Sequence, residues 1–214
     1  MTDIYEVLPI ADRIRGNRYV GRGIVIGKSA NGKYACSAYF IMGRSANSRN
    51  RIFVERDGVL YTEPYDVSRV EDPSLIIYAA QHRYGNRLIV TNGDQTDTIY
   101  EGLCAEKTFS EQDFRYEMSI LKSADAAGSA CNRYTFSFAA LPGLGHFLHT
   151  YVCDGNPLPT FQGEPERVSV PDDIDAFTAS LWDALDAENR ISLYVRYTNL
   201  ETGAEENRLI NQNR

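Results

Sequence analysis

Alternating apolar and polar positions predict two consecutive hairpins in the N-terminal part of the chain. Residues 19–27 and 33–42 alternate as strands, and Asn31-Gly32 between them is a strong signal for a tight turn. Residues 51–64 repeat this pattern around a turn at Asp57-Gly58. We therefore expect antiparallel strands in this part of the chain.

The next segment allows two interpretations. Pro73 could begin a helix that ends at Gly85. The run between them is rich in Ile and Tyr, however, and residues 88–90 form a clear apolar strand. We favour a hairpin that turns at Gly85-Asn86.

Two later segments have helical periodicity. A helix is expected over residues 110–122, where Ser110 and Asp113 resemble a capping box and the apolar face holds Phe114, Met118 and Leu121. A second helix is expected from Asp172 or Asp173, with an apolar stripe of Ile174, Phe177, Leu181 and Leu185. Residues 191–197 then alternate as a core-facing strand. Residues 154–171 contain four prolines and are expected to form a long loop.

The order of these elements indicates the fold class. Antiparallel hairpins followed by helices are typical of α+β proteins, in which helices cover the sheets. The chain shows no internal repeat, and its 214 residues suit one domain. We expect a single domain over residues 1–214.

Cysteine and histidine usage argues against a metal site. The four cysteines are far apart and form no CxxC pair, and the three histidines do not supply the spacing of a zinc site. We expect reduced, mostly packed thiols in a cytoplasmic protein. The longest apolar run, residues 75–80, is too short to cross a bilayer, so no membrane contact is expected.

Charge is distributed unevenly along an acidic chain. The net charge is −7, which argues against binding to a nucleic acid polymer. Residues 1–51 nevertheless hold nine basic and three acidic side chains; subtraction from totals of 22 and 29 leaves 13 basic and 26 acidic side chains elsewhere. This imbalance favours a small anionic ligand. A strand edge protected by solvated Arg and Lys side chains is the alternative.

A cluster of donors follows the strand at residues 33–42. It consists of Arg44, Ser45, Asn47, Ser48 and Arg49, and Arg22 is expected to join it from the neighbouring strand. The planar guanidinium donates two parallel hydrogen bonds to a phosphate or an oxyanion and stays charged. The cluster therefore predicts a site for an anionic group.

Three further features are candidates for binding or proton transfer. Residues 91–98 crowd polar side chains around Gly93 after an apolar strand, which predicts either a ligand-binding turn or a capped helix start. Glu117 lies at the border of the apolar face of the expected helix, where lost hydration would raise its pKa toward the range for acid–base work. The alternative for Glu117 is a solvated residue at the edge of the helix face. Tyr78, inside the apolar run of residues 75–80, is the third candidate, and its alternative is a tyrosine packed in the core.

Several stretches in chain order resemble the archaeal-type IMP cyclohydrolase family. They are YVGRGIVIGKSANGK, GRSANSR, DPSLIIY, VTNGDQTDTI and RYE, while LGHFLHTYVCDGNPLP and RISLYVRYTNLETG resemble the longer bacterial members. Each motif alone is common, but the combination covers most of the chain and is specific.

The resemblance implies a fold and an activity. The implied fold is an Ntn-hydrolase-like four-layer αββα sandwich of stacked antiparallel sheets, without that superfamily's N-terminal nucleophile. The implied activity is closure of 5-formamidoimidazole-4-carboxamide ribonucleotide to IMP with loss of water, which ends purine synthesis. No metal or cofactor is implied, and the expected ligand is a purine nucleotide; we also expect a homo-oligomer.

The family's functional residues can be carried over by position. Its active-site arginine, tyrosine and glutamate correspond to Arg49, Tyr78 and Glu117. Its Asn-Gly segment corresponds to Asn92, Gly93, Asp94, Thr96 and Asp97. Together with Arg22, Arg44, Ser45 and Asn47 these residues are the expected substrate contacts.

One departure keeps other functions open. Phe136 and Ser137 stand where the family tends to have Pro and Arg, so any ligand contact that this arginine makes in the family is not expected here. A related nucleotide-handling amidohydrolase and a non-catalytic purine-nucleotide-binding protein remain alternatives on the same scaffold.

Overall fold

The computed structural model describes residues 7–70, 73, 77–85, 87–91, 93, 95–106, 118–120, 134–137, 148–152 and 166–213. Within these residues the strands form two sheets. The first sheet contains, in spatial order, β1 (Leu8–Pro9), β11 (Glu166–Ser169), β10 (Leu148–Val152), β2 (Arg22–Lys28), β3 (Tyr34–Met42), β12 (Arg190–Asn199) and β13 (Glu205–Asn211). The second contains β4 (Ile52–Arg56), β5 (Val59–Glu63), β6 (Tyr78–Tyr84), β7 (Arg87–Val90), β9 (Tyr134–Ser137) and β8 (Met118–Ile120).

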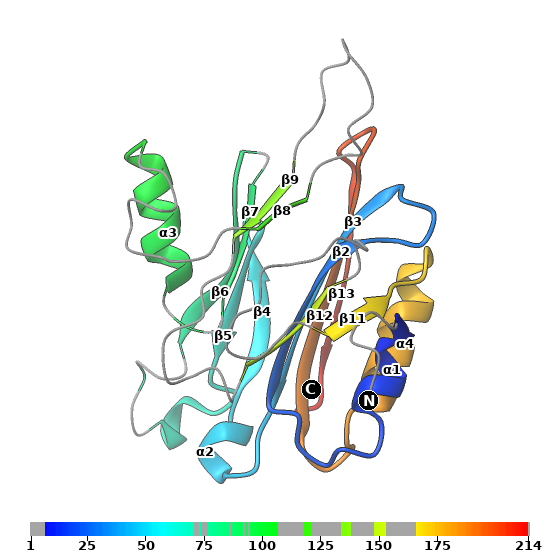
Figure 1. Cartoon of the computed structure of the whole chain (residues 1–214). Helices are drawn as coiled ribbons and strands as arrows, with labels where there is room; N and C mark the ends of the chain where they lie inside the picture. The colour runs from blue at the N-terminus through cyan, green and yellow to red at the C-terminus, as the bar shows by residue number, and fades with distance from the viewer. Residues whose placement is uncertain are drawn as a thin grey trace.

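Four α-helices and one short 3-10 turn accompany the sheets in this part of the chain. They are α1 (Ile10–Ile14), α2 (Ala46–Arg49), α3 (Gln95–Cys104), α4 (Ile174–Ala184) and η1 (Val67–Arg69). Helices α1 and α4 lie on one side of the first sheet, and α3 lies on the far side of the second (Figure 1). The chain is thus a mixed α and β structure in which two sheets are stacked between helices.

The predicted hairpins are confirmed. β2 pairs antiparallel with β3, and Gly32 in their turn has a φ of +73°. β4 pairs antiparallel with β5 across Asp57 and Gly58, whose φ values of 52° and 78° suit a tight turn that twists with its strands. The favoured hairpin between β6 and β7 is also present, so the helical alternative for that segment is wrong.

Four strand pairs correct the expectation of purely antiparallel sheets. β10 runs parallel to both β2 and β11, β1 runs parallel to β11, and β7 runs parallel to β9. Three of these pairs join strands that are far apart in sequence, and β10 and β11 are separated by 13 residues, so no tight-turn signal predicts any of the four pairs. Both sheets are therefore mixed, with antiparallel pairs within the hairpins.

Two sequence-based elements are wrong where the structure describes them. The helix expected over residues 110–122 is a strand at Met118–Ile120, because β8 pairs antiparallel with β9 and strand pairing overrides a local helical pattern. The loop expected over residues 154–171 contains β11 at its end. The remaining residues of both segments lie outside the described part, apart from the short stretch after β11.

The second expected helix is confirmed as α4. Its N-cap Asp173 accepts a hydrogen bond from the Ala176 amide at 2.9 Å, which satisfies one of the free amides at a helix start. The strand expected after it is β12.

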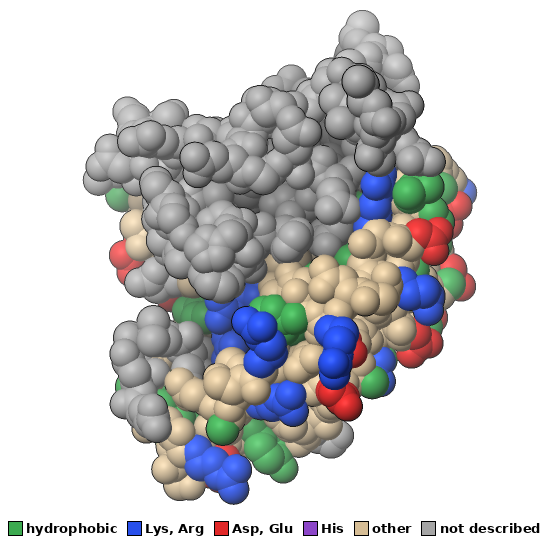
Figure 2. All heavy atoms as spheres, turned by 60° about the horizontal axis from the view of Figure 1, so that its bottom comes forward, with side chains coloured by type: hydrophobic (Ala, Val, Ile, Leu, Met, Phe, Trp, Pro, Cys, Tyr) green, Lys and Arg blue, Asp and Glu red, His purple; other side chains and the backbone are tan. Residues whose placement is uncertain are grey.

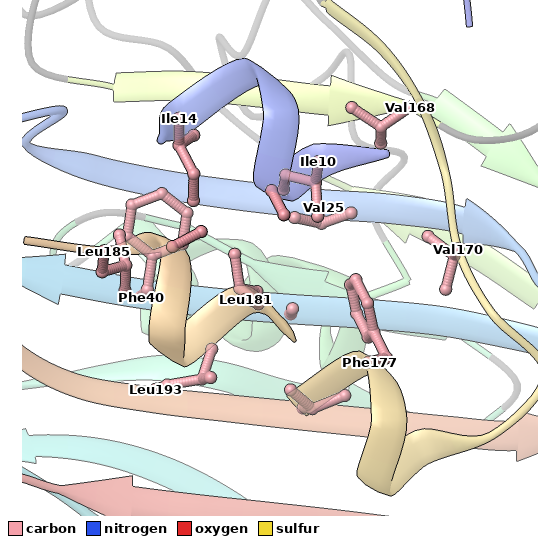
Figure 3. Packing of buried hydrophobic residues seen from close by; sticks show 14 of the residues in the cluster. Ile10, Ile14, Val25, Phe40, Val168, Val170, Phe177, Leu181, Leu185 and Leu193 are labelled. Carbon is pink, nitrogen blue, oxygen red and sulfur yellow. The ribbon is translucent and has the colours of Figure 1, made fainter. Parts of the chain in front are cut away.

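Three apolar clusters of the described residues hold the layers together, and the smallest of them, formed by Ile89, Ile99 and Leu103, packs α3 against the second sheet. The first lies between the first sheet and the pair α1 and α4; Figure 3 shows its side chains, including Phe40, Phe177 and Leu181, pointing toward one another. The second lies between the two sheets and includes Ile24, Tyr39 and Phe53. Burying such side chains stabilises the fold by about 1.5–3 kcal/mol each.

None of the helices among the described residues is long and apolar enough to cross a membrane. Cys36 is a buried free thiol and Cys104 is an exposed one, so one of the two described thiols is packed in the core. Cys131 and Cys153 lie outside the described residues.

Candidate active site

Residues from three separate strands meet at one end of the stacked sheets. Arg22 begins β2 and is paired with Ile41 near the end of β3, because the two strands are antiparallel. Arg51 directly precedes β4, and Tyr78 begins β6. The same end carries α2 and is the lower end in Figure 1.

A pair of tyrosine hydroxyls lies between the sheets at this end. The hydroxyl oxygens of Tyr39 and Tyr78 are 3.1 Å apart, and the side chains are 0% and 6% exposed. Burial raises the pKa of Tyr39 well above its usual value, with a smaller opposing effect from Arg22 and Arg51. The Tyr39 hydroxyl therefore stays protonated and can orient the hydroxyl of Tyr78.

Arg51 is a buried guanidinium beside these hydroxyls. It is 3% exposed, and its Nε donates to the Ser48 carbonyl oxygen at 2.9 Å. Burial lowers the pKa of Arg51, the charge of Arg22 lowers it further, and the nearby tyrosines oppose both effects. No carboxylate of the described residues forms an ion pair with Arg51. The guanidinium remains charged, since the usual pKa of Arg is above 12.

Arg22 provides a second cation at the same place. Its side chain is half-buried, and its Nε is buried without a hydrogen-bond partner among the residues that the structure describes. Two neighbouring guanidinium groups repel each other, and the repulsion is offset when an anionic group binds between or beside them. The arrangement is suited to an oxygen-rich anionic ligand.

Arg49 occupies a different position from Arg51. It is exposed at the end of α2, where its Nε donates to the Gly43 carbonyl at 3.1 Å and an Nη donates to Asn189 Oδ1 at 3.0 Å. Asn189 is 8% exposed and in turn donates to the Arg18 carbonyl oxygen at 3.0 Å. Arg49 thus also ties the turn after β3 to the start of β12.

The polar segment after β3 contains the short helix α2, which Ser45 caps at its N-terminus. Ser45 and Ser48 make a reciprocal capping box, which explains why small hydroxyl residues occur here. Arg44 is exposed, and its guanidinium carbon lies 4.2 Å from the centroid of the Tyr19 ring. Asn47 is half-buried, and its Oδ1 has no hydrogen-bond partner among the described residues. This segment therefore offers polar groups close to the buried cations.

The segment after β7 begins α3. The hydroxyl oxygens of Thr91 and Thr96 are 2.7 Å apart, and the Thr91 hydroxyl donates to the Gly93 carbonyl oxygen at 3.0 Å. Asp97 lies in the first turn of the helix, so the helix-start interpretation of this segment is confirmed. Three other predicted site residues, Asn92, Asp94 and Glu117, lie outside the described residues.

Basic side chains dominate this end of the molecule. Figure 2 shows Lys and Arg side chains gathered on the face that comes forward from the lower end of Figure 1, with few acidic side chains among them. Within the described residues, no group of three or more His, Cys, Asp or Glu side chains could hold a metal ion. Cations and hydroxyl groups are therefore the chemistry that the described site offers.

Sequence patterns pointed to Arg22 and Tyr78 but not to Arg51 and Tyr39. A signal for Arg51 was available, because it lies two positions before Phe53, whose side chain is in the core between the sheets. Alternate residues of a strand share a face, so Arg51 is directed to the same interior. The Arg-rich run alone could not distinguish it from exposed Arg49.

A family model described as IMP cyclohydrolase-like protein matches residues 19–203. This range includes all the residues of the described cluster. None of the curated proteins compared matches the chain.

Proposed function

Because the chain belongs to the IMP cyclohydrolase-like family, we propose that it is an IMP cyclohydrolase. The reaction closes the ring of 5-formamidoimidazole-4-carboxamide ribonucleotide to IMP with loss of water, as the final step of de novo purine synthesis. The observation that carries this proposal is the family match over residues 19–203, which contain the buried cations and the tyrosine pair. The substrate is a nucleotide, and a local basic end on an acidic chain suits its phosphate.

The reaction is an intramolecular addition followed by elimination. The carboxamide nitrogen attacks the formyl carbon, the carbonyl electron pair moves to the formyl oxygen, and the nitrogen loses a proton. The oxygen takes up two protons and leaves as water when its bond to carbon breaks, while the formamide nitrogen loses its proton and forms the new C=N bond. The atoms balance without an oxidant or reductant, so we propose no redox cofactor for this step.

An amide nitrogen is a weak nucleophile, so the protein must supply proton transfer and charge stabilisation. We assign Glu117 as the base toward the carboxamide and Tyr78 as the donor to the departing oxygen. Arg49 is assigned to charge on the formyl oxygen. Holding the formyl group against the amide removes much of the entropic barrier.

Binding of the nucleotide is assigned to the basic and polar groups at this end. Arg22 and Arg44 are the proposed phosphate contacts, because a guanidinium matches a phosphate with two parallel hydrogen bonds. The other proposed contacts come from the turn before α2 and the start of α3, namely Ser45, Asn47, Asn92, Gly93, Asp94, Thr96 and Asp97.

The wider properties of the enzyme complete the proposal. We propose that the stacked sheets belong to the Ntn-hydrolase-like type, that residues 1–214 form one domain, and that the protein acts as a cytoplasmic homo-oligomer. The layered order of helices and sheets in Figure 1 supports the first of these points.

An absorbance assay of ring closure with the purified chain tests the function. Turnover of the formylated nucleotide to IMP is the expected result. The alternative is a non-catalytic nucleotide-binding protein, which the Phe136-Ser137 departure favours. It predicts that IMP raises the Tm without any turnover, since a ligand bound to the native state stabilises it.

A further inference from the structure

Two arginine side chains are buried between the sheets, but their surroundings differ. Arg196 is 2% exposed, and it donates to Glu55 at 3.1 Å and to the Tyr194 hydroxyl at 2.7 Å. Arg51 is 3% exposed, yet among the described residues it has no carboxylate partner, and its hydrogen bond is the one from Nε to Ser48. Burying a charge without a partner costs folding free energy. An anionic or oxygen-bearing ligand that accepts hydrogen bonds from Arg51 would offset this cost.

The terminal nitrogens of Arg51 are available for such a ligand. Neither forms a hydrogen bond with a residue that the structure describes, whereas both Nε and an Nη of Arg49 are engaged by Gly43 and Asn189. Arg51 also lies near the hydroxyls of Tyr39 and Tyr78, which are 3.1 Å apart; burial and Arg22 lower its pKa, and both tyrosines raise it. A donor pair of guanidinium and phenol is thereby assembled in a site largely shielded from water.

We propose that Arg51 is a further catalytic residue, which donates to the formyl oxygen of the substrate from the interior, beside Tyr78 and in addition to the contact assigned to Arg49, while Tyr39 is a positioning residue that orients the Tyr78 hydroxyl. This inference rests on the proposed function. The half-buried Arg22 then meets the phosphate nearer the surface, and the buried Arg51 meets the reacting end of the same ligand.

The geometry gives each group a task in the balanced reaction. When the carboxamide nitrogen bonds to the formyl carbon, the carbonyl electron pair moves to the oxygen that Arg51 holds, and the cation stabilises the new charge. The proton that completes water then comes from Tyr78. A cation fixed in a low-dielectric site stabilises such a charge more strongly than one in water, because it needs no reorganisation.

Rates of ring closure in Arg51→Met and Arg51→Lys test the proposal. We expect kcat to fall about 10²–10³-fold in Arg51→Met, the range for loss of one oxyanion donor, and less in Arg51→Lys, which keeps the charge. The Tm of ligand-free Arg51→Met should change little, because loss of the Nε bond to the Ser48 carbonyl is offset by removal of a buried charge that Arg22 repels. A folded Arg51→Met with near-wild-type kcat would overturn the proposal.

Arg196→Met is the matched control. It removes a similarly buried guanidinium, but this one forms an ion pair with Glu55. Loss of that pair leaves Glu55 with its hydrogen bond from Asn207 and no ion pair among the described residues, so we expect a lower Tm and an unchanged kcat. If Arg51→Met instead behaves like Arg196→Met, Arg51 has a structural role and the proposal fails.

Chemical rescue keeps the test valid if Arg51→Met does not fold. Guanidinium at millimolar concentration should restore saturable activity to Arg51→Ala, whereas equal sodium chloride or urea should not. Absence of rescue in a folded Arg51→Ala that binds IMP would count against the proposal.

A binding measurement separates this inference from the proposed function. Wild-type protein should bind the formylated nucleotide more tightly than the aminoimidazole carboxamide ribonucleotide, which lacks the formyl oxygen, and Arg51→Met should lose that preference. This readout stands even if the wild type shows no turnover, in which case the proposed function fails and the contact survives. If wild type and Arg51→Met show the same preference for the formylated nucleotide, Arg51 does not contact the formyl oxygen, whether or not the protein shows turnover.

Discussion

Arg49→Lys distinguishes a catalytic role of Arg49 from its visible structural one. Lysine keeps the positive charge but loses the planar fork, so it can replace only one of the hydrogen bonds to Gly43 (3.1 Å) and Asn189 (3.0 Å). Asn189 is 8% exposed and keeps its own bonds to neighbouring groups. The substitution therefore removes one bond from an otherwise intact turn.

The structural part of the effect is small and can be calculated. Loss of one hydrogen bond costs about 1 kcal/mol. In a chain of 214 residues this lowers the Tm by about 2–4 °C. If Arg49 also stabilises the oxyanion, kcat falls by about 10²–10³-fold, equivalent to about 3–4 kcal/mol in the transition state.

Steady-state ring closure and thermal unfolding, measured on the same preparation, separate these effects. We expect a large fall in kcat, a small change in IMP affinity and the modest Tm decrease. Arg69→Lys, at an exposed arginine of η1 that pairs with Asp66, is the control and should leave kcat unchanged. Near-wild-type turnover of Arg49→Lys with a lowered Tm would show that Arg49 only joins the turn after β3 to β12.

Three further substitutions and one change of pH have defined outcomes. Arg22→Ala should weaken binding of IMP far more than binding of inosine, measured by calorimetry, and equal weakening would remove Arg22 from the phosphate site. Glu117→Gln should slow ring closure by about 10²–10⁴-fold and alter the acidic limb of the pH–rate profile. Tyr78→Phe should slow ring closure less and alter the alkaline limb. Full activity of Glu117→Gln would show that Glu117 is only a boundary residue of the helix and has no catalytic role. Burial lowers the pKa of His82 in the folded protein, and the charge of Asp97 opposes this effect. The unfolded state therefore binds more protons than the folded state, so the free energy of unfolding, and with it the Tm, should fall as the pH drops below about 6.5, the usual pKa of His. This fall in Tm should be smaller in His82→Phe, which retains a ring to stack on Tyr100, and an equal fall would exclude His82 as a source.

Local patterns were sufficient for the hairpins and for α4. The turn residues Gly32, Asp57 and Gly58 adopt positive φ, a conformation that Gly and Asp tolerate, and Asp173 caps its helix as expected. These elements depend on neighbours within a few residues. The ordered set of motifs likewise pointed to the family that the match over residues 19–203 shows.

Pairing between distant segments could not be obtained in this way. Met118–Ile120 has a helical pattern but forms β8, because β9 presents unpaired backbone groups at the edge of a sheet. The parallel pairing of β10 with β2 joins residues more than 120 positions apart. The backbone groups of a strand can form hydrogen bonds with any free sheet edge. The sequence of the strand therefore does not determine which strand it pairs with.

The buried cluster illustrates the same limit at the level of single residues. Arg49 and Arg51 stand two positions apart in one polar run, and composition treats them alike. Packing separates them: Arg51 turns into the space between the sheets beside Tyr39 and Tyr78, while Arg49 stays at the surface against Gly43 and Asn189. The residue type alone determines that an arginine side chain is charged and can donate two parallel hydrogen bonds. Which arginine is buried, and which residues surround it, is decided by the stacking of the two sheets, which exists only in the folded chain.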